Sequence, residues 1–160
     1  MERRERPKLA VTTMDKSIAE LVRKSDHKTL AIWAADCAER VLPYFEEKYP
    51  DDNRPRKAIE ACRTWARTGV FRMADVRKTA LAAHAAAREV KEDDAARSAA
   101  RAAGQALSTA HVPAHAIAAA IYAATSVRDA ANSIDADIAT TKERVWQYQH
   151  LLKLIEKFAS

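Results

Sequence analysis

The stretch Ala102–Val127, AAGQALSTAHVPAHAIAAAIYAATSV, decides the fold of this chain. It runs for 26 residues without an Asp, Glu, Lys or Arg, although these four types make up 31% of the sequence. A long segment that excludes charge is typical of one that water does not reach. Polar side chains nevertheless stand among its alanines, so the stretch is either the buried centre of a helical domain or the lining of a site. The polar positions are Gln105, Ser108, Thr109, His111, His115 and Tyr122.

The composition predicts an all-α protein. Hydrophobic residues make up 48% of the 160 positions, alanine supplies about half of them, and the chain has two glycines. Alanine is the strongest helix former, whereas the tight turns of β-sheets use glycine. We therefore expect a compact antiparallel bundle of six to seven helices with alanine-rich central helices. The bundle should form a single domain over residues 15–160, after a disordered basic tail at 1–14.

The sequence indicates a cytoplasmic protein without a cofactor. The first residues, MERRERPK, are charged, and no apolar signal segment follows them. The charge-free stretch is interrupted by Gln105, two histidines and Pro113, which argues against a membrane span. Cys37 and Cys62 are too few for a disulfide framework or a zinc site. Both fall on apolar helix faces, which predicts small buried side chains in a reducing compartment.

Start and stop signals divide the first half of the chain into helices. Asp15 is a predicted N-cap for a short helix over about 15–24, and Ser25 or Asp26 caps the next. Pro43 should end or kink that second helix, because proline removes a backbone donor and clashes one turn back.

The third helix is predicted to start at Asn53 and Pro55 and to end at Gly69. Its polar side should carry an ion-pair ladder of residues spaced three to four apart, namely Arg56, Glu60, Arg63 and Arg67, in which Glu60 pairs with two of the arginines.

Four further segments complete the predicted bundle. They cover about 74–92, 92–109, 113–132 and 136–159, with Pro113 opening the third of them. The last helix should present a broad apolar face that is buried on both sides or forms a homodimer contact. Its apolar positions are Ile138, Val145, Tyr148, Leu151, Leu152, Leu154, Ile155 and Phe158.

The positive charge is concentrated in Arg54–Lys78. This segment carries a net charge of +6, so the remainder of a chain of net charge +5 sums to −1. It can be a solvated ion-paired face, a protein-binding face, or a nucleic-acid face on which the bases stack on Trp65 or Phe71. The nearby carboxylate of Glu60 and the inward position of Trp65 argue against the nucleic-acid face. The partner-binding candidates are Arg54, Arg56, Lys57, Arg63 and Arg67.

His111 and His115, in the string HVPAH, are the local candidates for chemistry. Histidines four residues apart on a helix can share a metal, but a third ligand is needed, and His111 precedes the predicted helix. The alternative is that each histidine satisfies a nearby polar group, alone or in a polar cluster with His84. Nothing places a nucleophile beside a base, so we expect no enzyme activity.

Three strings resemble a family of immunity proteins from bacterial polymorphic toxin systems, the immunity-protein-5-like family. They are WAADCAERVLPYFEEKYPDDNRPRKAIEACRTW (Trp33–Trp65), AARAAGQALSTAHVPAHAIAAAIYA (Ala99–Ala123) and ERVWQ (Glu143–Gln147). The resemblance covers about residues 28–150. The motif positions, many of which are interpreted as fold determinants, are Trp33, Cys37, Glu39, Arg40, Pro43, Arg54, Pro55, Arg56, Trp65, His84, Gly104, Gln105, His111, Pro113, His115, Tyr122, Glu143, Arg144 and Trp146.

The resemblance implies an all-helical cytoplasmic protein that binds a cognate toxin domain and blocks it without catalysis. Because opposite fields speed association, the basic segment suggests a toxin with an acidic surface that faces Arg54–Lys78. Reversing the charge of Arg56, Arg63 and Arg67 should then slow association. The alternatives are a helical interaction or nucleic-acid-associated module, and a histidine-containing bundle that binds a metal or small molecule.

Overall fold

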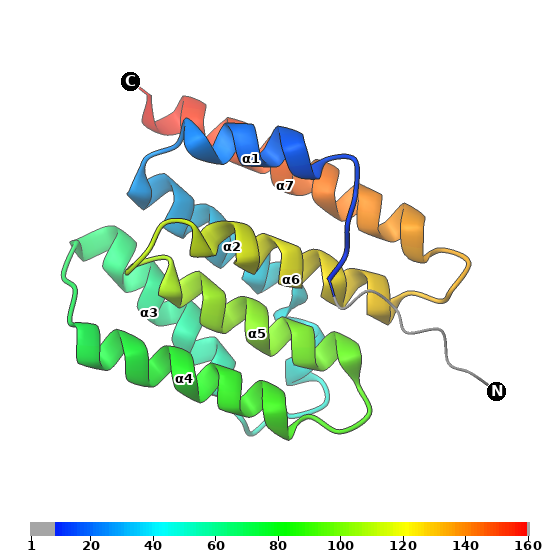
Figure 1. Cartoon of the computed structure of the whole chain (residues 1–160). Coiled ribbons are helices and arrows are strands. Elements are labelled where there is room, and N and C mark those ends of the chain that lie inside the picture. The colour runs from blue at the N-terminus through cyan, green and yellow to red at the C-terminus, as the bar shows by residue number, and fades with distance from the viewer. Residues whose placement is uncertain (1–8, 160) are drawn as a thin grey trace.

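The computed structural model describes residues 9–159, and over that range the chain forms seven α-helices and no strand (Figure 1). The all-α prediction is confirmed. Residues 1–8 of the predicted basic tail lie outside the described residues. The helices are α1 (Asp15–Arg23), α2 (His27–Glu46), α3 (Arg54–Thr68), α4 (Met73–Glu89), α5 (Asp94–Ser108), α6 (His115–Ala130) and α7 (Ala136–Phe158).

The central helix is α5, which packs against α2, α3, α4 and α6. In Figure 1, α4, α5 and α6 form successive rows, with α2 and α3 behind them and α1 and α7 along one edge. Ten of the fifteen residues of α5 are buried, and apart from Ser98, Gly104 and Leu107 they are alanines. Side chains this small let neighbouring helix axes approach at the short end of the usual ~8–10 Å range.

The charge-free stretch divides into buried and exposed parts. Its residues in α5 and α6 supply much of the core, including Ala103, Ala106, Ala119 and Ala120. The turn between the helices, residues 111–114, is exposed. The helical parts of the stretch therefore form the centre of the bundle, and the turn at residues 111–114 forms part of its surface.

Large side chains enter the core from α2. Trp33, Leu42 and Phe45 are all at most 1% exposed. The indole Nε1 of Trp33 donates a hydrogen bond to the backbone oxygen of Gln147, at 2.8 Å, which ties α2 to α7. A buried indole nitrogen needs such a partner because its desolvation is otherwise uncompensated.

Four of the six buried residues of α7 are polar, which corrects the predicted apolar face. Arg144 is 1% exposed, and its guanidinium lies 2.6 Å from Asp15 Oδ1 and 2.8 Å from Gln147 Oε1. The Gln147 amide donates to the Ala120 backbone oxygen at 2.9 Å. Leu151 and Leu154 continue the buried stripe, whereas Ile138 and Phe158 are exposed, so the homodimer through this helix stays a prediction.

Two helix-end predictions are confirmed by the backbone. Asp26 caps α2 by accepting a hydrogen bond from the Thr29 amide at 2.7 Å. Gly69 ends α3 in the left-handed region, at φ 70°, where a residue with a Cβ is strained.

Two other helix-end predictions, at Asp15 and Pro113, are wrong, and the one at Asn53 is right in position only. Asp15 lies inside the first turn of α1 instead of capping it, because its carboxylate pairs with Arg144. Asn53 occupies the N-cap position of α3 and Pro55 lies in its first turn, as predicted, but the Asn53 side chain makes no cap hydrogen bond. Asp52 accepts from the Arg54 amide instead. Pro113 lies in the turn before α6, which begins at His115.

Pro43 does not end α2, which continues to Glu46. The proline is on the exposed side of the helix, where water can solvate the carbonyl that loses its intrahelical partner. The amide of Glu47 still donates to the Pro43 oxygen at 3.0 Å, so the helical pattern resumes within one turn.

The segment before α1 contacts the bundle. Ala10 is buried, and its amide donates to Thr125 Oγ1 of α6 at 2.9 Å. No helix of residues 9–159 is both long and apolar enough to cross a bilayer.

Both cysteine thiols should resist modification in the folded protein. Burial raises the pKa of Cys62 to about 12 and that of Cys37 well above its usual value. We expect Ellman's reagent at pH 8 to label both thiols quickly in denaturant and neither in the native protein. Thiols of the unfolded chain ionise at pH ~8.5, whereas the buried thiols stay protonated to higher pH. The neutral thiols therefore stabilise the folded state fully below pH ~8.5, and this stabilisation is lost as the pH rises toward 12. Rapid labelling of the native protein would contradict the burial of these side chains.

Removing the carboxylate that pairs with Arg144 should be costly. Asp15→Ala leaves a buried guanidinium without its counter-charge, and we expect a loss of ~3 kcal/mol in the free energy of unfolding. Adding Arg144→Met should restore most of that loss, because the unpaired charge is then gone. Urea denaturation measures both, with Glu20→Ala, an exposed acidic position of the same helix, as the matched control. An equal loss in the free energy of unfolding for Asp15→Ala and Glu20→Ala would contradict a stabilising role of the Asp15–Arg144 ion pair.

Candidate functional site

Arg54, at the start of the basic segment, is engaged in ion pairs. Its guanidinium contacts Asp52 through two hydrogen bonds, of 2.9 and 2.7 Å, and also pairs with Glu89 of α4. These two carboxylates raise the pKa of Arg54 above its usual value. Bidentate pairing of this kind is among the stronger charge-assisted hydrogen bonds, so this side chain serves the α3–α4 contact.

Arg56 and Arg63 pair with α2, which corrects the predicted ladder along α3. Arg56 contacts Glu39 and Glu46, each at 2.7 Å, and Arg63 contacts Asp36 at 2.7 Å. Over residues 9–159 Glu60, the expected partner of both, forms no ion pair. The carboxylates of α2 line the groove that α3 occupies, so the arginines bridge two helices instead of bonding along one.

The polar face continues onto α7. Asp36 also accepts a hydrogen bond from His150 Nε2 at 2.7 Å, and the His150 ring stacks on Trp146 with centroids 4.6 Å apart. Arg40 lies 3.8 Å above the same indole and bonds Glu143 at 2.5 Å. The surface formed by α2, α3 and α7 is therefore held by its own charges and rings.

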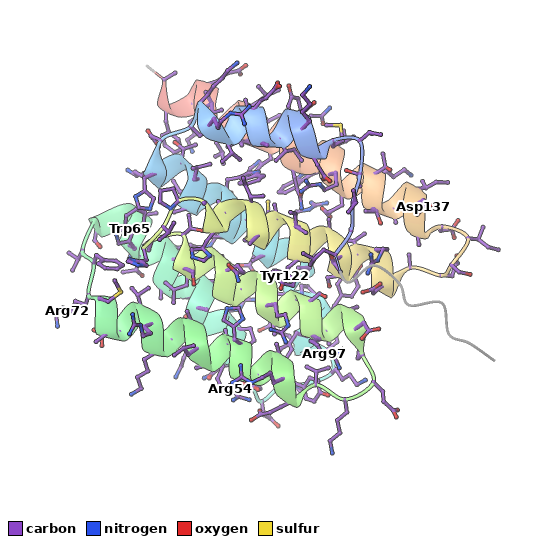
Figure 2. The ribbon with its side chains drawn as sticks, in the orientation of Figure 1. Arg54, Trp65, Arg72, Arg97, Tyr122 and Asp137 are labelled. Carbon is purple, nitrogen blue, oxygen red and sulfur yellow. The ribbon has the colours of Figure 1, made fainter. Side chains whose placement is uncertain are left out.

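Five cations of the basic segment remain exposed. They make no ion pair within the described part of the chain, and they are Lys57, Arg67, Arg72, Arg77 and Lys78. All but Lys57 belong to the last turn of α3, the connection to α4, or the first two turns of α4. The unpaired positive charge of the basic segment is therefore concentrated at one end of the bundle, the end that Arg72 marks in Figure 2, whereas Arg54 lies toward the other.

Apolar side chains are exposed at that same end. Val70, Phe71 and Met73 lie in or beside the α3–α4 connection, and Val112 lies in the α5–α6 connection. The Phe71 ring stacks on His111 with centroids 5.9 Å apart and an interplanar angle of 13°, so the two connections are in contact. We call these five residues the loop-end surface. Sequence reasoning singled out Phe71 and His111 but missed Val70, Met73 and Val112. The signal for Val70 was its place beside Phe71, directly after a helix-terminating glycine, and Val112 stands inside the HVPAH string.

A polar and aromatic layer lies next to the loop-end surface. His27, in the first turn of α2, donates from Nε2 to the Thr109 backbone oxygen at 2.5 Å. Its ring lies 4.5 Å from that of Trp65 in α3, which Figure 2 places at the same end as Arg72. Sequence reasoning missed His27 because its partner is a backbone carbonyl 82 residues away.

The three candidate histidines have different surroundings. His115 Nδ1 bonds Gln105 Oε1 at 2.8 Å, whereas His111 is exposed and stacks on Phe71. His84 packs against Gly104, and its Nδ1 is buried without a hydrogen-bond partner. Burial, and then the nearby positive charges of Arg101 and Arg88, lower the pKa of His84. Over residues 9–159 no three His, Cys, Asp or Glu side chains are grouped so that they could hold a metal ion.

A surface hollow lies at the opposite end of the bundle, where α2 and α6 end and α5 begins. Its lining includes Tyr44, Lys48 and Asp93. Lys48 Nζ lies 3.4 Å from Asp93 Oδ2, so these two opposite charges of the hollow are paired with each other.

The sequence matches the family described as "Imm-5 like putative immunity protein" over residues 20–154. This chain belongs to the Imm-5-like family. The matched region contains all seven helices except part of α1 and the end of α7. No curated protein and no solved structure matches the sequence.

The Imm-5-like motif positions are concentrated in the internal contacts described above. Trp33, Arg144 and Gly104 lie in the core, and Arg40 and Trp146 belong to the α2–α7 face. Of the motif residues described here, Pro113 and His111 are exposed at the loop end. Motif membership therefore does not by itself mark a contact with a partner.

Gly104 and His84 should behave as a pair. A Cβ at position 104 would lie 2.7 Å from His84 Nε2, so Gly104→Ala should lower the free energy of unfolding by ~1–2 kcal/mol. In a His84→Ala background the same change should raise stability by up to ~1 kcal/mol, because alanine is the better helix former. Urea denaturation of the four proteins of this cycle gives the coupling. Gly69→Ala is the control, since its cost comes from a positive φ and should be equal in both backgrounds. The same sign for Gly104→Ala in both backgrounds would contradict the steric account.

Proposed function

We propose that this Imm-5-like protein is a non-catalytic cytoplasmic inhibitor that neutralises a cognate toxin domain by binding and covering it. The observation that carries the proposal is the family match over residues 20–154, which spans nearly the whole bundle. The electrostatics support it, because the carboxylates of α2 that face α3 are paired with Arg56 and Arg63 instead of surrounding a cavity.

The exposed cations indicate the chemistry of the partner surface. Paired arginines such as Arg56 and Arg63 offer little field to an approaching protein, because carboxylates lie within hydrogen-bond distance of them. Arg67, Arg72 and their unpaired neighbours on α4 keep their full charge at the surface. A toxin that they attract carries an acidic surface.

The first experiment asks whether binding occurs at all. The product of the gene immediately upstream is expressed with and without this protein, and growth and co-purification are measured. We expect the protein to restore growth and to co-purify in a stoichiometric complex. An upstream product that is toxic and neither binds this protein nor is relieved by it would overturn the proposal.

Charge reversal should then test whether the unpaired arginines at this end of the bundle steer association. Arg67→Glu with Arg72→Glu should lower the association rate constant at low salt by about 10-fold and flatten its dependence on ionic strength. Lys153→Glu, an exposed position on α7, should change neither. Stopped-flow association with the purified toxin domain measures the rates. An unchanged rate for the double variant would rule out steering by this end of the bundle.

A further inference from the structure

We propose that the toxin docks on the loop-end surface, Val70, Phe71, Met73, His111 and Val112, through an apolar side chain surrounded by acidic groups. This inference rests on the proposed toxin binding and adds its location and the chemistry of the partner. It moves the centre of the interface from the polar side of α3 to the junction of two connections at the end of the bundle.

The first argument is the exposure of apolar side chains. Val70 is 65% exposed, and Phe71, Met73 and Val112 are 36–38% exposed. They come from two connections about 40 residues apart in the sequence, yet the contact between Phe71 and His111 joins them into one surface. Adjacent large apolar side chains on exposed connections mark interaction sites more often than singly exposed ones do.

The second argument is that this surface is ordered before any partner arrives. Gly69 sets the path out of α3, and the stacked Phe71 and His111 rings hold the two connections together. Beside them, His27 joins α2 to the end of α5 through the Thr109 oxygen. A preorganised surface loses little conformational entropy on binding, so more of the contact energy appears as affinity.

The third argument is the charge around the apolar centre. Arg67, Arg72, Arg77 and Lys78 flank it without ion-pair partners among residues 9–159, and Asp75 is the acidic residue between them in sequence. An apolar centre with a charged rim is the usual anatomy of a specific protein interface. The rim steers the partner, and the centre supplies the anchor that slows dissociation.

The same features favour a protein over a nucleic acid as the occupant. Nucleic-acid surfaces stack bases on successive aromatic faces. Here one face of Phe71 is covered by His111, and the other anchors, Val70, Met73 and Val112, have no flat ring. Branched and flexible aliphatic side chains instead fit an apolar protrusion of a folded partner.

The test measures binding of the purified toxin domain by three variants of the full chain. Val70→Ser, Phe71→Ser and Val112→Ser should each raise Kd at least ~10-fold, mainly through faster dissociation. Ile138→Ser is the matched control for Val70→Ser, because Ile138 is 59% exposed and lies beside Asp137, at the opposite end of the bundle in Figure 2. Thermal unfolding of each variant verifies the fold, and the exposure of Val70 makes Val70→Ser the variant least able to disturb it.

The outcomes separate this inference from the function on which it rests. Tight binding by the wild-type chain and by all three variants overturns the docking surface and leaves toxin binding intact. Absence of binding by the wild-type chain overturns toxin binding, and the docking surface with it. A 20-nucleotide single strand is the remaining probe. Salt-sensitive binding of that strand, lost in Phe71→Ser, would replace the protein partner with a nucleic acid.

Discussion

Four helices surround α5, and they can do so because α5 presents almost nothing larger than a methyl group. The sides of α5 that contact these helices exclude charge, since each buried charge would need a partner inside the core. Its charged residues, Asp94, Arg97 and Arg101, lie on the one stripe of the helix that is not buried. The neighbours must then supply the volume, and α2 does so with Trp33, Leu42 and Phe45. The local requirement for room is clearest at Gly104, where the His84 ring occupies the space of a Cβ.

An alanine core buries little apolar area per residue, so the outer helices need further attachment. The helix α7 is attached by polar contacts, through Arg144 to α1 and through Gln147 to α6 and α2. Such contacts are specific in geometry, because a guanidinium and an amide accept few arrangements of partners. We infer that the alanine-rich centre sets how close the helices come, and that the polar contacts set their register.

Patterns that are local in sequence predicted the fold well, and patterns that need distant partners did not. The cap at Asp26 and the stop at Gly69 depend on a few neighbouring residues, and both were predictable. The pairing of Arg63 was not, because Glu60 three residues away and Asp36 in another helix look equally suitable until the groove between α2 and α3 is known. Arg144 was named as a motif position, but its burial was not predicted for the same reason, since its carboxylate partner lies 129 residues earlier.

The candidate site shows the same division between local and distant patterns, but the bundle topology could have predicted which connections lie together. In an antiparallel bundle, the connections that follow α1, α3 and α5 all lie at one end. The apolar run after Gly69 and the HVPAH corner follow α3 and α5, so both should lie there, as the Phe71–His111 contact shows. The helix faces next to α5 are closely packed in the core, and residues on the face of α2, α3 and α7 form ion pairs with one another. An end of the bundle is free of these constraints, and its connections can carry exposed apolar groups without disturbing the packing of the helices.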